Sequence, residues 1–167
     1  MLDQWRAVLG EVAVPAPAVD WAAVEAGLGT ALPTDYRVLA DNYPTLCIDS
    51  FLHVFHPAAD WSLRDQNEVT LGRMRSHRED FPELFPHPLF PEPGGLLSWG
   101  CTDNADELLW LTVGEPDEWP VVVTDRDDWY THDGGMLSFL GGMLRGEVRC
   151  PVLGTQFPSA GYTVKGQ

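Results

Sequence analysis

The chain has 167 residues, 44 % of them apolar, so it is long enough to bury the core of one domain without disulfides or metals. Its 25 acidic and 10 basic residues give a net charge of −15, which argues against nucleic acid or an anionic membrane as a partner. No segment approaches the roughly 20 consecutive apolar residues of a membrane span, and the N-terminus lacks the features of a signal peptide. The three cysteines form no CxxC motif. We therefore expect a cytoplasmic protein with free thiols.

Three short helices are expected in the first 44 residues. Apolar residues spaced by three and four predict a helix near the N-terminus, so residues 1–18 comprise this helix and a proline-rich connection. Asp20 is suited to cap a second helix over 21–28, which glycines end. A third helix over 34–43 has an amphipathic pattern and is stopped by Pro44.

The middle of the chain predicts one strand, one helix and one ordered loop. Residues 47–56 are rich in aromatic and β-branched residues, a composition typical of a strand. Residues 61–78 are polar with a few apolar anchors, which indicates a surface helix. Five prolines in 81–93 exclude a helix or a central strand there, and the aromatic residues among them indicate a loop that packs on the fold.

The second half predicts an antiparallel meander followed by a helix. Three strand patterns are separated by turn-forming residues, namely 96–101, 107–113 and 119–124. A last helix follows Gly134–Gly135, and 151–167 form an irregular tail. We expect one α+β domain over 1–167, in which the N-terminal helices and the C-terminal helix pack on an antiparallel or mixed central sheet.

Candidate metal ligands are few. Asp103, Asp106 and Glu107 carry the oxygen ligands that a hard cation prefers, but they lack the spacing of an EF-hand and are typical of a hairpin turn. His53 and His56 are three residues apart, so on one strand they point to opposite faces and cannot share a metal. We expect neither a metal nor another cofactor.

Catalytic motifs are also lacking. His132 and Asp133 are adjacent in sequence and no serine or cysteine nucleophile motif accompanies them. No GxSxG, P-loop or GxGxxG signature occurs, and Gly141–Gly142 lies in an apolar helical pattern that favours close helix packing. We therefore predict that the chain is not an enzyme.

Acidic residues are concentrated between positions 103 and 133. This segment contains ten acids and the single base Arg126, a net charge of −9. Trp119 and Trp129 border its acidic turns, where a tryptophan is suited either to anchor a partner or to fold over the sheet. We predict an anionic ridge for protein binding, with Trp119 as an anchor and these carboxylates: Asp103, Asp106, Glu107, Asp117, Glu118, Asp125, Asp127 and Asp128.

The order of motifs resembles that of SUKH-superfamily domains. Residues 27–43 resemble their opening helices, 96–114 their central hairpin, and 119–147 their third strand, tryptophan-bearing loop and last helix. The resemblance covers about 120 residues, with Ala105 standing where a turn glycine is expected. The superfamily includes fungal cell-wall synthesis regulators and bacterial immunity proteins that neutralise polymorphic toxins, often nucleases. It has no shared catalytic centre, so the resemblance implies a binding scaffold.

Three functions follow from these observations. The first is an immunity protein that blocks a basic toxin, such as a nuclease, through an acidic surface. The second is a regulatory or scaffolding module that recruits a cellular protein, which genomic context distinguishes from an immunity protein. The third is a small metal-dependent hydrolase. Binding of Mg²⁺ or Mn²⁺ at micromolar concentrations, measured by calorimetry, would support this alternative.

Overall fold

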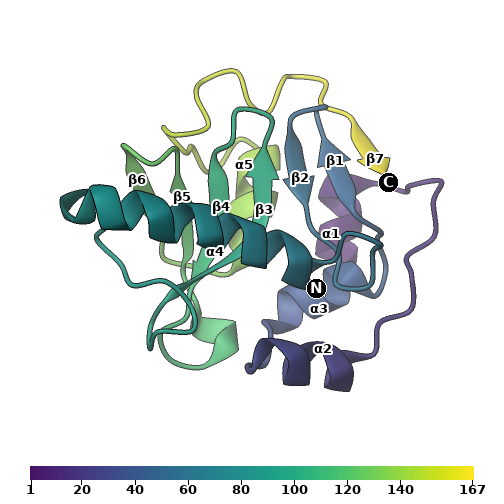
Figure 1. The fold of residues 1–167 in the computed structure, drawn as a ribbon. Helices are drawn as coiled ribbons and strands as arrows, with labels where there is room; N and C mark the ends of the chain where they lie inside the picture. Colours follow the sequence, from purple (N-terminus) through teal and green to yellow (C-terminus); the bar gives the residue numbers. More distant parts are fainter.

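Seven antiparallel strands form one sheet in the order β6-β5-β4-β3-β2-β1-β7, and helices cover both of its faces (Figure 1). The structure is a computed structural model that describes residues 1–167. The strands are β1 (Leu46–Ile48), β2 (Leu52–Val54), β3 (Leu96–Thr102), β4 (Glu107–Leu111), β5 (Val121–Thr124), β6 (Trp129–His132) and β7 (Val164–Gly166). The predicted α+β class with an antiparallel sheet is confirmed.

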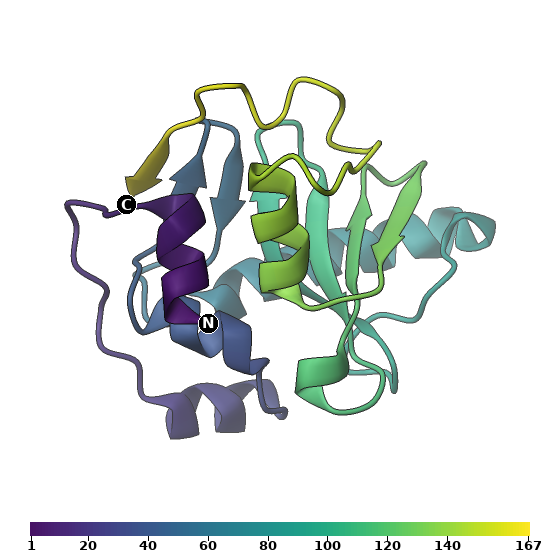
Figure 2. The ribbon, with the colours of Figure 1, turned by 180° about the vertical axis from the view of Figure 1, so that it is seen from behind.

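Helix α4 crosses one face of the sheet, α1 and α5 lie behind it, and α2 and α3 lie at its lower end (Figure 1); Figure 2 shows the opposite face, with the purple α1 and the yellow-green α5 in front. The helices are α1 (Leu2–Leu9), α2 (Trp21–Leu28), α3 (Thr34–Ala40), α4 (Leu63–Asp80) and α5 (Gly142–Leu144). Short helical turns are η1 (Pro82–Leu84), η2 (Pro116–Glu118) and η3 (Leu137–Gly141), the last of which continues into α5. No helix has both the length and the apolar character needed to span a bilayer.

The helix ends follow the capping residues that the sequence places there. The Asp20 side chain accepts the Ala23 N–H at the start of α2, and Gly29 ends this helix with φ 81°. Ser62 and Asp65 form a reciprocal capping box at the start of α4. The apolar anchors of α4 are buried as predicted (Leu63, Leu71 and Met74).

The central strands separate two cores, because β4 is apolar on both of its sides. Leu108 and Trp110 are fully buried in the larger core beneath α1, α3 and the last helical segment. Leu109 and Val122 are buried in a smaller core beneath α4. Covering both faces of the sheet in this way buries nearly every apolar side chain of the meander.

Residues 47–56 form a hairpin, so the prediction of one strand is wrong. Asp49 and Ser50 have φ of 57° and 52°, and the Ile48 carbonyl accepts the Phe51 N–H at 3.0 Å. Two successive positive φ values define a type I′ turn, which reverses the chain between β1 and β2. The turn contains neither glycine nor asparagine, and the flanking apolar residues concealed it in the sequence.

Two further strands were not predicted. Residues 129–132 were assigned to a loop and form β6 beside β5. The tail 151–167 was expected to be irregular throughout, but its last residues form β7 beside β1. The rest of the tail crosses the end of the sheet (Figure 1) and is held by the Ser159–Asp49 hydrogen bonds of 2.8 and 3.0 Å.

The turn between β3 and β4 places Ala105 at φ 66°, the conformation that glycine adopts without strain. We expect Ala105→Gly to raise the free energy of unfolding by about 0.5–1 kcal/mol, because a left-handed alanine is strained. Urea denaturation measures this change. As a control, Gly154→Ala should destabilise, since Gly154 has φ 73° and no atom within 4 Å of an added Cβ. A less stable Ala105→Gly protein, or a Gly154→Ala protein as stable as the wild type, would contradict the strain argument.

Candidate functional site

The acidic residues of 103–133 lie at two opposite ends of the sheet, so the prediction of one continuous ridge is wrong. Glu107, at the start of β4, pairs with Thr124, at the end of β5, which brings the β3–β4 and β5–β6 turns together at one end. The β4–β5 loop with Asp117 and Glu118 lies at the other end. The five residues of β4 separate the ends by roughly 13 Å, at about 3.3 Å per residue.

Two of the predicted surface acids are buried. Asp106 is 5 % exposed and accepts the Thr102 hydroxyl at 2.6 Å. Glu107 is 4 % exposed, and its carboxylate lies 2.9 Å from an Arg73 guanidinium nitrogen and 3.3 Å from the Thr70 hydroxyl. Burial raises the pKa of Glu107, and the nearby Arg73 opposes this rise. Neither carboxylate is available for steering a partner, which corrects the prediction.

Asp117 and Glu118 hold the chain at the far end of the sheet. The two Asp117 oxygens accept the N–H and the hydroxyl of Thr34 at 2.6 and 2.9 Å, which caps the start of α3 from another part of the chain. Glu118 forms a reciprocal capping box with Glu115 around η2. Both acids therefore have structural roles that their positions in the sequence do not reveal.

Trp119 belongs to the larger core, so the prediction of a partner anchor is wrong. Its side chain is 3 % exposed, its Nε1 donates to the Gly114 carbonyl at 3.2 Å, and its ring centroid lies 6.3 Å from that of Trp110. Trp129 is half-buried and donates to the Leu84 carbonyl at 2.9 Å. Trp61, just before α4, is 56 % exposed and is one of several large apolar side chains on the surface, with Phe81 and Val113.

The remaining predicted acids form a group that we call the acidic turns: Asp103, Asp125, Asp127 and Asp128. Asp103, Asp127 and Asp128 are exposed, and Asp125 is half-buried. Asp125 Oδ1 accepts the N–H groups of Asp127 and Asp128 at 3.1 and 2.8 Å, which fixes the β5–β6 turn. Asp103 Oδ1 lies 2.8 Å from His53 Nε2. Arg126 is the one base within these two turns.

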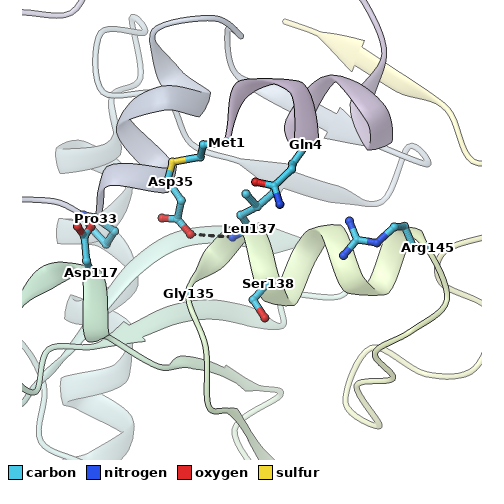
Figure 3. Close-up of a pocket in the computed structure, with 9 residues that line it drawn as sticks. All are labelled: Met1, Gln4, Pro33, Asp35, Asp117, Gly135, Leu137, Ser138 and Arg145. Carbon is cyan, nitrogen blue, oxygen red and sulfur yellow. Dashed lines mark hydrogen bonds between the residues drawn. The ribbon is translucent and has the colours of Figure 1, made fainter.

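A polar pocket of about 490 Å³ lies at the opposite end, between α1, the start of α3 and the last helical segment (Figure 3). Asp35 is its central charged group, and its oxygens accept the Leu137 and Tyr36 N–H groups at 2.8 and 2.7 Å. Burial raises the pKa of Asp35. A Cβ on Gly135 would lie 2.8 Å from Asp35 Oδ2, so this close approach requires glycine. The carboxylates of the pocket thus cap helices.

The fold also brings together a hydroxyl and an imidazole that sequence reasoning did not pair. His132 Nε2 lies 2.9 Å from Ser138 Oγ at the edge of this pocket, and burial lowers the pKa of His132. This hydrogen bond joins the end of β6 to the last helical segment. Residues six apart across a turn give no sequence signal for such a contact.

A row of titratable side chains crosses the sheet at the end near the acidic turns. His53 lies directly opposite both Cys47 and Cys101, its neighbours on the adjoining strands. Burial, with the nearby Glu107, raises the pKa of Cys101 to about 11, so its thiol is protonated at neutral pH. His56 points to the other face, where its Nε2 bonds the Ala40 carbonyl at 2.9 Å. No group of three or more His, Cys, Asp or Glu side chains is arranged to hold a metal ion.

No protein-family model matches the sequence, and neither a curated protein nor a solved structure matches the chain. The observations that bear on function are therefore the motifs in the sequence and the geometry of the acidic turns.

Proposed function

We propose that this chain is a non-catalytic protein-binding domain, an immunity protein that neutralises a polymorphic toxin with a basic surface. The observation that carries the proposal is the position of the acidic turns. Three exposed carboxylates from two different turns, those of Asp103, Asp127 and Asp128, lie at one end of the sheet. Arg126 is the one arginine in these turns. The resemblance of the motif order to SUKH domains supports the same function.

A dense group of like charges acts on a partner before contact. Negative charge concentrated on one surface raises the association rate of a cationic protein by roughly 10 to 10³, and added salt weakens the effect. A nuclease surface that grips phosphate is basic and is therefore complementary to the acidic turns. The net charge of −15 adds a long-range attraction of the same sign.

The side-chain contacts support binding over catalysis. The polar pocket has a partly buried carboxylate and a hydroxyl–imidazole pair, but hydrogen bonds to backbone groups or between the pair itself occupy these atoms. The buried acids near the turns are likewise paired with Thr102 and Arg73. In the acidic turns, Asp127 and Asp128 are exposed and their carboxylates have no such partners, which favours a surface that attracts another protein.

The test uses the double variant Asp127→Lys with Asp128→Lys. Both side chains are exposed and only their backbone N–H groups and the Asp128 carbonyl take part in the turn, so the fold should tolerate the change. The probe is the toxic domain encoded beside this chain in its genome, and its association rate constant is measured by stopped flow at low and high salt. We expect the rate at low salt to fall by at least about tenfold and its salt dependence to weaken.

A matched control reverses the same number of charges elsewhere. Glu11 and Asp60 are exposed and lie outside the acidic turns, so Glu11→Lys with Asp60→Lys changes the net charge equally. This control should slow association much less. An equal effect of the two variants would assign the attraction to net charge alone and contradict the proposed surface. Absence of any binding to the adjacent toxin would favour the regulatory alternative.

A further inference from the structure

Strand β6 (Trp129–His132) forms one edge of the sheet, and its outer side pairs with no other strand. The opposite edge differs. Strand β7 has three residues, and a Cβ on Gly166 would lie 2.7 Å from the Pro44 ring and 3.2 Å from Val14, so other segments pack against it. An open edge presents unpaired N–H and C=O groups that a strand from another chain can bind.

The hydrogen-bond register shows which backbone groups of β6 face outward. The Leu111 N–H donates to the Pro120 carbonyl at 3.0 Å across β4 and β5. In an antiparallel pair, the residues that are hydrogen-bonded to the neighbouring strand alternate along the chain. Pro120, Val122 and Thr124 therefore direct their backbone groups toward β4. The residues between them, Val121 and Val123, direct theirs toward β6.

The residues opposite these two valines are His132 and Tyr130. Their N–H and C=O groups accordingly face inward and complete the ladder between β5 and β6. The alternate residues, Trp129 and Thr131, present their backbone N–H and C=O groups to the outside. Thr131 is also the exposed side chain of the strand, while the other three are half-buried.

The charges around this edge select the kind of strand that can add to it. The strand itself has no carboxylate, lysine or arginine, but Asp127 and Asp128 precede it and Asp133 follows it. A second copy of this chain would bring the same acids to both ends of the pair, and like charges would oppose the pairing. An extended segment with basic residues would find opposite charges at both ends.

We propose that the outer edge of β6 binds an extended, basic segment of a protein partner by strand addition. The inference rests on the proposed protein-binding function and specifies the contact that follows electrostatic attraction to the acidic turns. Backbone hydrogen bonds at Trp129 and Thr131 hold the segment, and Asp127, Asp128 and Asp133 contact its basic side chains. The contact is non-covalent.

The test uses the whole chain and a short synthetic peptide of alternating lysine and valine, with a version of that peptide interrupted by proline as its control. Backbone amide exchange is followed by NMR at low salt. The Trp129 and Thr131 amides should exchange rapidly in the free protein and become protected on binding, whereas the Tyr130 and His132 amides are protected throughout. The proline-interrupted peptide should give no protection.

Two variants separate strand addition from charge attraction. Thr131→Pro removes an outward N–H without breaking the β5–β6 ladder, a change that edge strands tolerate, and should weaken peptide binding by about tenfold. Thr131→Val keeps the N–H and should bind like the wild type. The inward amides of Tyr130 and His132 confirm that Thr131→Pro is folded.

Three results would overturn the inference. One is peptide binding without protection of Trp129 and Thr131, the second is equal binding by the two Thr131 variants, and the third is no saturable binding at low salt. None of them bears on the association of the toxin with the acidic turns. That association is measured separately with the lysine variants of Asp127 and Asp128, so the two proposals can fail independently.

Discussion

Replacing Trp119 by alanine should lower the free energy of unfolding by about 3–5 kcal/mol, the range found for large aromatic side chains in cores. The indole is 3 % exposed and packs on Trp110, which in turn contacts Tyr36 and Trp99 at centroid distances of 5.1 and 6.1 Å. The truncation leaves a cavity where η2 joins the sheet. It also removes the hydrogen bond to the Gly114 carbonyl. Urea denaturation followed by circular dichroism measures the loss.

The matched control is Trp61→Ala, which removes the same side chain from an exposed position. Its free energy of unfolding should change by less than about 0.5 kcal/mol, because surface substitutions rarely cost more. A stable Trp119→Ala protein with weakened partner binding would contradict the core assignment and would restore Trp119 as an interface anchor.

Most helices and strands could be predicted from sequence patterns that depend on residues close together in the chain. The stripe on α4 and the Asp20 cap of α2 appear in the sequence because helix periodicity and capping involve residues close together in the chain. The turn at Asp49–Ser50 escaped detection because its residues are not the usual choice for positive φ. Strands β6 and β7 have few residues, and pairing with distant strands determines them more than their own composition.

The candidate site was predicted less well than the fold. Acidic residues that are close together in the sequence need not be close together in the folded protein. In an antiparallel meander, successive turns lie at alternate ends of the sheet. The predicted meander therefore already separates Asp117 and Glu118 from the acidic turns. Burial of Asp106 and Glu107 depends on Thr102 and Arg73, and no spacing rule connects Glu107 with Arg73, 34 positions earlier.

The second large effect is expected from Arg73→Leu, which leaves the Glu107 carboxylate buried without its cation. Loss of one partner from a buried ion pair costs about 3–5 kcal/mol, but the Arg73 side chain is 59 % exposed and water screens it. We therefore expect the free energy of unfolding at pH 7 to fall by about 2 kcal/mol. Urea denaturation at pH 7 and pH 5 measures this value.

The sign of the pH dependence follows from the pKa of Glu107, which burial raises above its unfolded value while Arg73 lowers it. A carboxyl group with a raised folded pKa stabilises the fold when protonated, and this contribution is lost as the pH rises through that pKa. Without Arg73 the folded pKa rises further. The loss in Arg73→Leu should therefore be largest at pH 7 and should shrink as the pH falls toward the ordinary carboxyl range, about 4.5.

Two controls identify the buried charge as the cause. Adding Glu107→Gln to Arg73→Leu removes the charge and keeps a hydrogen-bonding partner for Thr70, so most of the stability should return and the added pH dependence should vanish. Arg78→Leu deletes from the same helix an ion pair whose carboxylate, that of Glu92, is exposed, and it should leave the denaturation midpoint nearly unchanged. If Glu107→Gln does not restore the stability of the Arg73→Leu protein, the aliphatic stem of Arg73 stabilises the fold by packing. In that case Arg73 would not be offsetting an energetic cost of burying the Glu107 charge.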